Sequence, residues 1–184
     1  TSSRVKKIVN LFLKANYLDP RTRQAIVEVL SKPDMVNFQV IPHLVLVLRK
    51  VTKLYPSVLP MVVDNIFEDI QIGLESVDIR FNRRCISQVR YLAALYNFQL
   101  IDWKPLNLLL YRILNTGHQG NQPRPNDFTN ETDLPNNYFR ISMCTELLEA
   151  IHILSSITID SYQFMAYFEY YIFCKTQPLP IEVE

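Results

Sequence analysis

Apolar residues recur at three- and four-residue intervals along almost the whole chain, as they do on the buried face of an amphipathic helix. The pattern predicts an all-α protein of about nine to ten helices joined mostly by short loops. Antiparallel helix pairs stacked side by side, as in a HEAT-like solenoid, satisfy this order. The expected helices cover residues 4–16, 20–31, 34–54, 58–76, 78–97, 105–117, 138–154 and 160–175.

Aspartate, proline and glycine mark the predicted helix boundaries. Asp19 and Pro20 form a helix start, with aspartate as the cap and proline at the first helical position. This helix is expected to bury Ile26, Val29 and Leu30. Asp34 is the expected cap of the next segment, which Pro42 divides into a short and a longer helix. Gly117 is expected to close the sixth helix as its C-terminal cap.

The segment over residues 160–175 is rich in aromatic and β-branched residues, so its composition alone resembles that of a strand. Its length and the spacing of its apolar positions favour a buried helix instead. The residues expected to be buried are Phe164, Met165, Phe168, Tyr171 and Ile172.

Residues 117–137 contain three prolines, two glycines and five asparagines, a composition typical of loops. We interpret this segment as an exposed surface loop rather than a functional insertion, because tolerated loops are the commoner case. The length of 184 residues fits one domain. We expect that domain to span residues 1–176 and to be followed by a linker-like tail over residues 177–184.

The composition disfavours several classes of protein. Glycine occurs only three times, and neither GxGxxG nor GxxxxGK is present, which argues against nucleotide-binding α/β enzymes and hairpin-rich β folds. Cys85, Cys144 and Cys174 are far apart and form no CxxC motif, which favours reduced thiols in an intracellular protein. The three histidines are equally scattered, so we expect no metal site and no cofactor.

The formal net charge of +1 conceals a segregation of charge along the chain. Residues 1–60 carry a net charge of +7 and residues 61–80 a net charge of −4. Residues 81–120 carry +4 and residues 121–184 carry −6. Blocks of opposite sign suit the recognition of charged partners, provided that folding does not interleave them.

The sequence VVDNIFEDIQIGLE, residues 62–75, is an acidic amphipathic helix. At about 100° per residue, Asp64, Glu68 and Glu75 fall within about 40° of one another and form one acidic ridge. Ile72 projects about 60° from the centre of this ridge, away from the apolar stripe. An apolar anchor beside charged residues is typical of a protein interface, whereas the alternative is a solvated helix face with one stray isoleucine. The residues expected to face the core are Val63, Ile66, Phe67, Ile70, Leu74 and Val77.

The following helix has a basic face that contains Arg83, Ser87 and Arg90. These residues could contact RNA phosphates. They could equally pair with Asp69 or Asp78 of the preceding antiparallel helix, and we favour this pairing.

Four stretches, taken in order, resemble one family: VVDNIFEDIQIGLE, FNRRCIS, YLAALYNFQLID and YFRISMCTELLEA. They are similar to the third middle domain of nonsense-mediated mRNA decay factor two (up-frameshift protein two), a relative of the middle domain of eukaryotic initiation factor four-G. The resemblance covers residues 55–175 well and the first 55 residues weakly. It implies a right-handed stack of antiparallel helix pairs. Cys85 stands where the family pattern leads us to expect a more polar or basic residue, which would weaken a basic surface there.

The resemblance implies a non-catalytic scaffold domain in nonsense-mediated mRNA decay. Members of the family bind the RNA-recognition-motif domain of up-frameshift protein three, and the family's acidic positions correspond to Asp64, Glu68 and Glu75, with Ile72 beside them. The resemblance also implies contacts with neighbouring domains of the full protein, a cytoplasmic or perinuclear location, and no membrane partner.

The alternative function is binding of RNA or of a helicase through basic residues, as in other translation-factor middle domains. The residues that would carry RNA binding are Arg49, Lys50, Lys53, Arg83 and Arg90. The salt dependence of binding distinguishes RNA binding from protein binding, because contacts with phosphates release counterions and the affinity for RNA therefore falls steeply with salt. Catalysis is disfavoured, since no nucleophile elbow GxSxG occurs.

Overall fold

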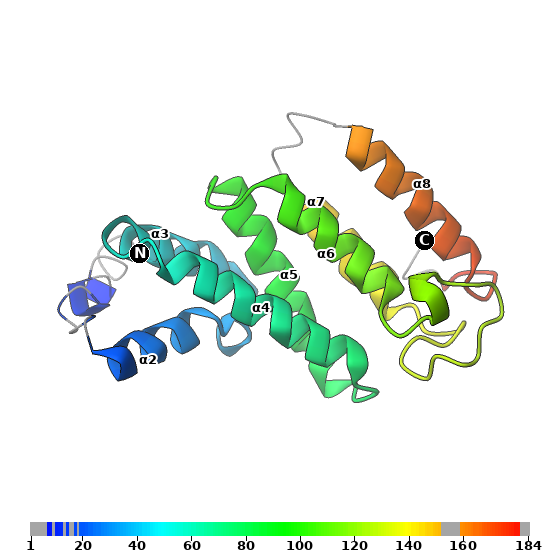
Figure 1. Cartoon of the computed structure of the whole chain (residues 1–184), viewed down its shortest axis with the longest axis horizontal. Coiled ribbons are helices and arrows are strands. Elements are labelled where there is room, and N and C mark those ends of the chain that lie inside the picture. The colour runs from blue at the N-terminus through cyan, green and yellow to red at the C-terminus, as the bar shows by residue number, and fades with distance from the viewer. Residues whose placement is uncertain are drawn as a thin grey trace.

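The computed structural model describes residues 19–151 and 159–180, together with residues 7, 8, 10–12, 14 and 17. Within these residues every regular element is helical and none is a strand, as the hydrophobic pattern predicts (Figure 1). The α-helices are α2 (Pro20–Leu30), α3 (Ile41–Leu54), α4 (Val58–Glu75), α5 (Arg80–Asn97), α6 (Trp103–Asn115), α7 (Phe139–Ala150) and α8 (Ile159–Phe173). Three single-turn 3-10 helices are η1 (Pro33–Met35), η2 (Phe38–Val40) and η3 (Gln119–Asn121).

Seven α-helices have defined bounds within the described residues, and residues 7, 8, 10–12 and 14 are also helical, so the number of helices is slightly below the nine to ten expected. The helix predicted over residues 4–16 lies largely outside the described residues. The short helix predicted ahead of Pro42 is wrong, because Val36 and Asn37 adopt extended backbone conformations that end the run after one 3-10 turn. Asp34 lies inside η1 and does not cap it.

The helices form two layers (Figure 1). In one layer α2 packs on α4, α4 on α6, and α6 on α8; in the other α3 packs on α5, and α5 on α7. Consecutive helices such as α4 and α5 run in opposite directions and pack against each other. This arrangement is the predicted stack of antiparallel helix pairs. No helix among the described residues is long and apolar enough to cross a bilayer.

Most helix boundaries follow the local signals in the sequence. Asp19 caps α2, since its Oδ2 accepts a hydrogen bond from the backbone N–H of Thr22 at 3.0 Å, and Pro20 occupies the first turn. At the start of the long loop over residues 117–137, α6 ends at Asn115, and Gly117 follows with a φ of +80°. That left-handed conformation is the one glycine adopts without strain.

Three residues predicted to be buried are exposed instead. Val77 is 73% exposed because α4 ends at Glu75, so Val77 leaves the helical face on which periodicity placed it. Val29 and Met165 are 59% and 51% exposed. They lie on α2 and α8, whose closest packing among the described helices is on α4 and on α6, respectively.

Gly73 and Cys85 bring α4 and α5 into close contact. A Cβ atom added to Gly73 would lie 2.4 Å from the Cys85 Sγ, too close for two real atoms. The Cys85 side chain is fully buried, and burial raises the pKa of its thiol to about 11. The expectation that Cys85 weakens a basic surface is therefore wrong, since the thiol faces the interior.

Candidate functional site

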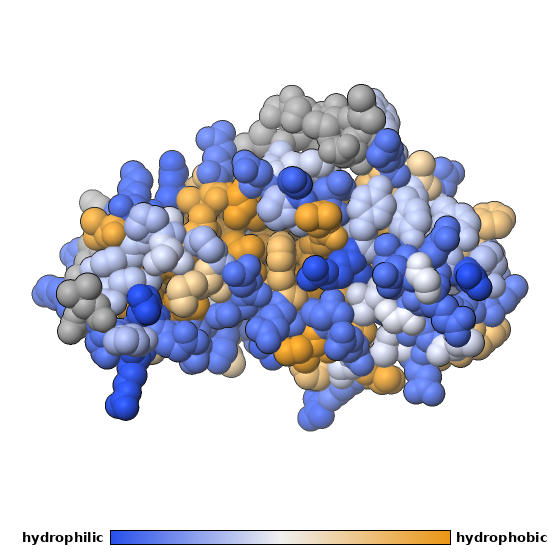
Figure 2. Space-filling view, viewed as in Figure 1, coloured by the Kyte–Doolittle hydropathy of each residue, from blue (hydrophilic) through white to orange (hydrophobic). Residues whose placement is uncertain are grey.

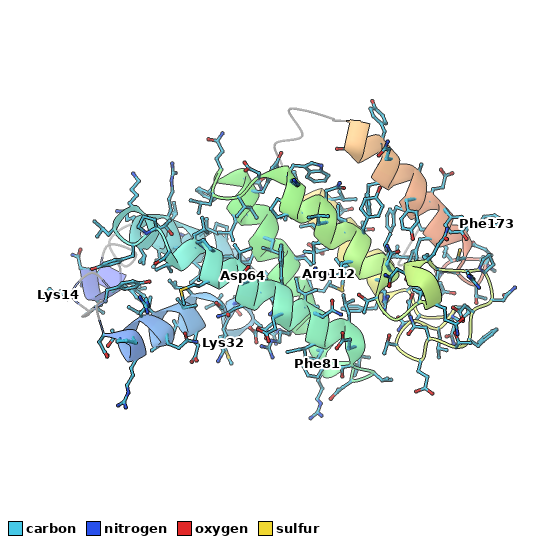
Figure 3. The ribbon with its side chains drawn as sticks, in the orientation of Figure 1. Lys14, Lys32, Asp64, Phe81, Arg112 and Phe173 are labelled. Atoms are coloured by element: carbon cyan, nitrogen blue, oxygen red, sulfur yellow. The ribbon has the colours of Figure 1, made fainter. Side chains whose placement is uncertain are left out.

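The acidic ridge, formed by Asp64, Glu68 and Glu75, lies on the exposed side of α4. The opposite side of the helix is buried in the core through Val62, Ile66, Ile70 and Leu74. Asp64 occupies the middle of α4 and Glu75 its last turn (Figure 3). The structure thus confirms that the three carboxylates are exposed.

The ridge carries charge that the described part of the chain does not neutralise. None of the ion pairs among the described residues involves Asp64, Glu68 or Glu75. Glu75 accepts a hydrogen bond from the neutral amide of Gln71, with Nε2 2.5 Å from Oε1. By contrast, Asp69 on the same helix is paired with Arg84 and bound by the Gln88 amide.

The position of Glu75 makes this exposed charge more informative. Glu75 is the last residue of α4, where the aligned peptide dipoles place partial negative charge. A carboxylate at a helix C-terminus is mildly unfavourable for the fold, by about 0.3–1 kcal/mol at an exposed position. Ile72, which is 47% exposed, lies on the same exposed side of the helix.

Two open grooves flank the end of α4. The first has a volume of about 540 Å³ and separates α4 from α6 and the long loop; its lining includes Gln71, Glu75, Arg112, Asn121 and Thr132. The second, of about 390 Å³, lies beside the connection between α4 and α5. Both are broad enough to receive side chains of a partner molecule, and Glu75 lies on the rim of the first.

The basic candidates do not form one surface. Arg49, Lys50 and Lys53 are exposed on the last two turns of α3. Arg83 is exposed on α5. Arg90 differs, because its Nε lies 2.5 Å from Glu146 Oε1 of α7 and its guanidinium lies 4.1 Å from the centre of the Phe38 ring.

Asp69 and Asp78 do pair with arginines of α5, as expected, but the arginines are not the ones that were predicted. Asp69 pairs with Arg84, at 2.5 Å, and Asp78 pairs with Arg80, at 2.6 Å. Neither Arg83 nor Arg90 takes part. Ser87, the third residue of the predicted basic face, is buried and donates a hydrogen bond to the carbonyl oxygen of Arg83. Arg84 is the arginine that reaches from α5 to α4.

A buried polar cluster, which we call the Asp133 cluster, was missed in the sequence. Asp133 is 1% exposed. Its carboxylate lies 2.8 Å from His118 Nε2 and 2.6 Å from Lys175 Nζ, and it accepts a hydrogen bond from the Tyr171 hydroxyl at 2.9 Å. The guanidinium of Arg140 lies 3.6 Å away.

The electrostatics of the Asp133 cluster favour an ionised carboxylate. Burial raises the pKa of Asp133, but the hydrogen bond from His118 and the positive charges of Arg140 and Lys175 together lower this pKa by a larger amount. The net shift of the pKa is therefore downward. Burial lowers the pKa of Lys175 and raises that of Tyr171. Because the cavity beside these groups measures only about 10 Å³, the cluster has no room for a substrate.

The Asp133 cluster corrects the interpretation of residues 117–137 as a purely exposed loop. His118, Asn130 and Asp133 are buried. Arg140 also binds the carbonyl oxygens of Ile113 and Thr116 at the end of α6, at 3.0 and 2.7 Å. The loop is therefore fixed to α7 and α8 by charge-assisted hydrogen bonds, from Arg140 to Thr132 and from Tyr171 to Asp133. The histidine, aspartate and lysine of the Asp133 cluster are not spaced at a helical period, so no pattern in the sequence indicated the cluster.

Metal binding finds no support in the described residues. No group of three or more histidine, cysteine, aspartate or glutamate side chains within them is arranged to hold an ion. The cysteines Cys85, Cys144 and Cys174 are all buried free thiols.

Comparison with known proteins gives the family. A family model described as "MIF4G domain" matches residues 1–154. "Nonsense-mediated mRNA decay protein 2" of Saccharomyces cerevisiae is 37% identical over 180 residues, which cover 97% of this chain and 16% of that protein. "Regulator of nonsense transcripts UPF2" of Arabidopsis thaliana is 30% identical over 128 residues, and "Regulator of nonsense transcripts 2" of Homo sapiens is 27% identical over 136 residues. The Arabidopsis and human matches each cover 67% of this chain and 10% of the relative. The chain therefore spans a small part of its relatives' length.

Proposed function

Because the chain belongs to the MIF4G domain family, we propose that it is a non-catalytic, protein-binding domain of nonsense-mediated mRNA decay. Its partner is the RNA-recognition-motif domain of up-frameshift protein three, held by the acidic ridge of α4. The pathway is supported by the yeast relative, which aligns with 97% of the chain and is named for nonsense-mediated decay. The cytoplasm is the proposed location, and other domains of a longer chain are proposed neighbours.

The observation that supports this proposal best is the unpaired charge of the acidic ridge. The fold pairs Asp69 and Asp78 with arginines, yet Asp64, Glu68 and Glu75 form no ion pair among the described residues. A row of exposed carboxylates costs self-repulsion and contributes nothing to packing. The same row raises the association rate of a basic partner and excludes acidic ones.

An RNA-recognition-motif domain has the complementary chemistry. Its four-stranded sheet is built to hold RNA, with aromatic side chains that stack on bases and basic side chains that contact phosphates. A helix that presents three carboxylates along one face offers such a sheet negative charge in place of phosphate. Ile72 supplies an apolar contact beside the charges.

Titration calorimetry of the 184-residue chain with the RNA-recognition-motif domain of up-frameshift protein three from the same organism tests the proposal. We expect a one-to-one complex whose affinity falls between about 50 mM and about 300 mM salt, because exposed charges are screened. Absence of heat and of complex formation at the lower salt concentration would refute the proposed partner.

RNA binding is a second candidate, supported by a separate observation. Arg49, Lys50 and Lys53 are exposed on α3, and within the described residues none of them forms an ion pair. Three neighbouring cations on one helix suit non-specific contact with phosphates. Because α3 belongs to the layer that does not contain α4, this activity is compatible with a protein bound to the acidic ridge.

A further inference from the structure

The connection between α4 and α5 exposes two large apolar side chains. Val77 is 73% exposed and Ile79 is 77% exposed. The next connection along the chain, between α5 and α6, is also apolar, but its residues Phe98, Leu100 and Ile101 pack against the core. The apolar residues of the α4–α5 connection therefore serve no comparable purpose in the fold.

Ile79 precedes α5 and already has helical dihedral angles, with φ −54° and ψ −21°, and its side chain makes no capping hydrogen bond. Asp78 supplies the cap instead, because its Oδ1 accepts a hydrogen bond from the backbone N–H of Arg80. Ile79 therefore contributes neither a cap nor buried apolar surface to the fold, which is typical of a residue on a functional surface.

The connection is held in one conformation by its own hydrogen bonds. The Ser76 hydroxyl accepts from the backbone N–H of Asp78 at 3.1 Å, and Asp78 Oδ1 accepts from the backbone N–H of Arg80 at 2.9 Å. Arg80 also pairs with Asp78 through its guanidinium. A fixed backbone presents Val77 and Ile79 at a low cost in conformational entropy on binding.

The two residues follow the acidic ridge closely in the sequence, just beyond the end of its helix. Val77 follows Glu75 by two positions, and Ile72 precedes it by three. Figure 2 shows hydrophobic surface at the lower edge of the molecule, at the C-terminal end of α4. The groove of about 390 Å³ lies beside this surface, and Val77, Ile79 and Tyr138 contribute to its lining.

We propose that Ile72, Val77 and Ile79 form an apolar contact patch for the same partner that the acidic ridge binds. The proposal rests on the proposed function and adds the chemistry of the partner's surface. That surface has exposed aromatic or aliphatic side chains surrounded by lysine and arginine. Charge complementarity with the ridge and continuity with it select a basic protein surface rather than RNA, whose phosphates the carboxylates repel.

The patch and the ridge make separable contributions to binding. Burial of apolar surface gives a negative heat-capacity change on binding, whereas the exposed carboxylates determine the salt dependence. Loss of the patch should therefore change the heat capacity and leave the salt dependence unaltered. Loss of ridge charge should do the reverse.

The test is titration calorimetry, at several temperatures and two salt concentrations, with the RNA-recognition-motif domain of up-frameshift protein three. The variants are Val77→Ser, Ile79→Ser and the double variant, with Val29→Ser as the matched control, since Val29 is 59% exposed on α2. A thermal melt of each variant checks the fold, and Ile79→Ser should melt as the unaltered chain does, because Ile79 is 77% exposed and Asp78 caps the helix.

We expect the double variant to bind about tenfold more weakly or worse, with a less negative heat-capacity change and an unchanged salt dependence. Val29→Ser should bind as the unaltered chain does. If the double variant keeps full affinity and heat capacity while Glu75→Arg abolishes binding, the apolar patch is refuted and the proposed function stands. If the unaltered chain itself does not bind the domain, the proposed function and the patch are both refuted.

Discussion

Asp133 and Lys175 form a buried ion pair, with Nζ 2.6 Å from Oδ1, although 42 positions separate them in the chain. The pair joins the long loop to the residues that follow α8. His118 and Tyr171 complete the hydrogen bonding of the carboxylate. Through this cluster the loop that lines the groove beside Glu75 acquires a defined position.

Replacement of Asp133 should destabilise the protein strongly. Asp133→Asn leaves the charges of Lys175 and Arg140 buried without a counter-ion, and removal of one partner of a buried pair typically costs about 3–5 kcal/mol in the free energy of unfolding. Urea unfolding followed by circular dichroism measures the change. Glu131→Gln, an exposed position in the same loop, is the control and should shift stability by less than about 0.5 kcal/mol.

The stability of the protein should depend on pH through Asp133. Its folded-state pKa lies below the ordinary value of about 3.9, so folding favours the ionised form. The stabilisation is fully present above the unfolded-state pKa and is lost as the pH falls through the folded-state pKa. Urea unfolding from about pH 6 to about pH 3 should show a shallower acid loss in Asp133→Asn than in the unaltered chain. Parallel curves for the two proteins would contradict this role of Asp133.

The helical fold is largely predictable because its signals are local. Caps such as Asp19 and breakers such as Pro20 and Gly117 act within one turn, and the apolar spacing identifies the helices even in the aromatic segment of α8. Periodicity fails where a helix ends or the stack ends. Val77 lies past the end of α4, and Val29 lies on α2, which among the described helices packs mainly on α4.

Only part of the candidate site was predictable from the sequence, because only part of it depends on local signals. The exposure of Asp64, Glu68 and Glu75 follows from positions on a single helix. The Asp133 cluster depends on residues brought together from a loop and two distant helices, which no local pattern encodes. Which arginine meets Asp69 depends on the rotation of α5 against α4, and the sequence alone does not fix that rotation.

The contact between α4 and α5 should tolerate no side chain at Gly73. Gly73→Ala places a Cβ atom 2.4 Å from the Cys85 Sγ, and overpacking of a core contact typically costs about 1–3 kcal/mol. Cys85→Ala removes the sulfur and should restore part of that loss in the double variant. A double-mutant cycle of unfolding free energies checks this, and strictly additive effects would contradict the contact.

RNA binding, if it accompanies protein binding, should depend on α3. Replacement of Arg49, Lys50 and Lys53 together by alanine should weaken binding of a single-stranded RNA uniformly across sequences. It should also flatten the plot of log affinity against log salt, because fewer counterions are released. Fluorescence anisotropy at several salt concentrations measures both effects. Unchanged affinity in the triple variant would show that these cations are only solvated surface.

The most direct test of the account is calorimetry of Glu75→Arg with the RNA-recognition-motif domain of up-frameshift protein three. Close interfacial charge pairs couple by about 1.5–7 kcal/mol, so charge reversal should lower the affinity by about a hundredfold or more. Asp64→Arg and Glu68→Arg should act in the same direction, and Ile72→Ala should weaken binding without a change of charge. Glu149→Arg, an exposed acid on α7, should bind normally, and all variants should melt as the unaltered chain does. Full affinity of Glu75→Arg with an unchanged melt would contradict the assignment of the acidic ridge as the docking surface.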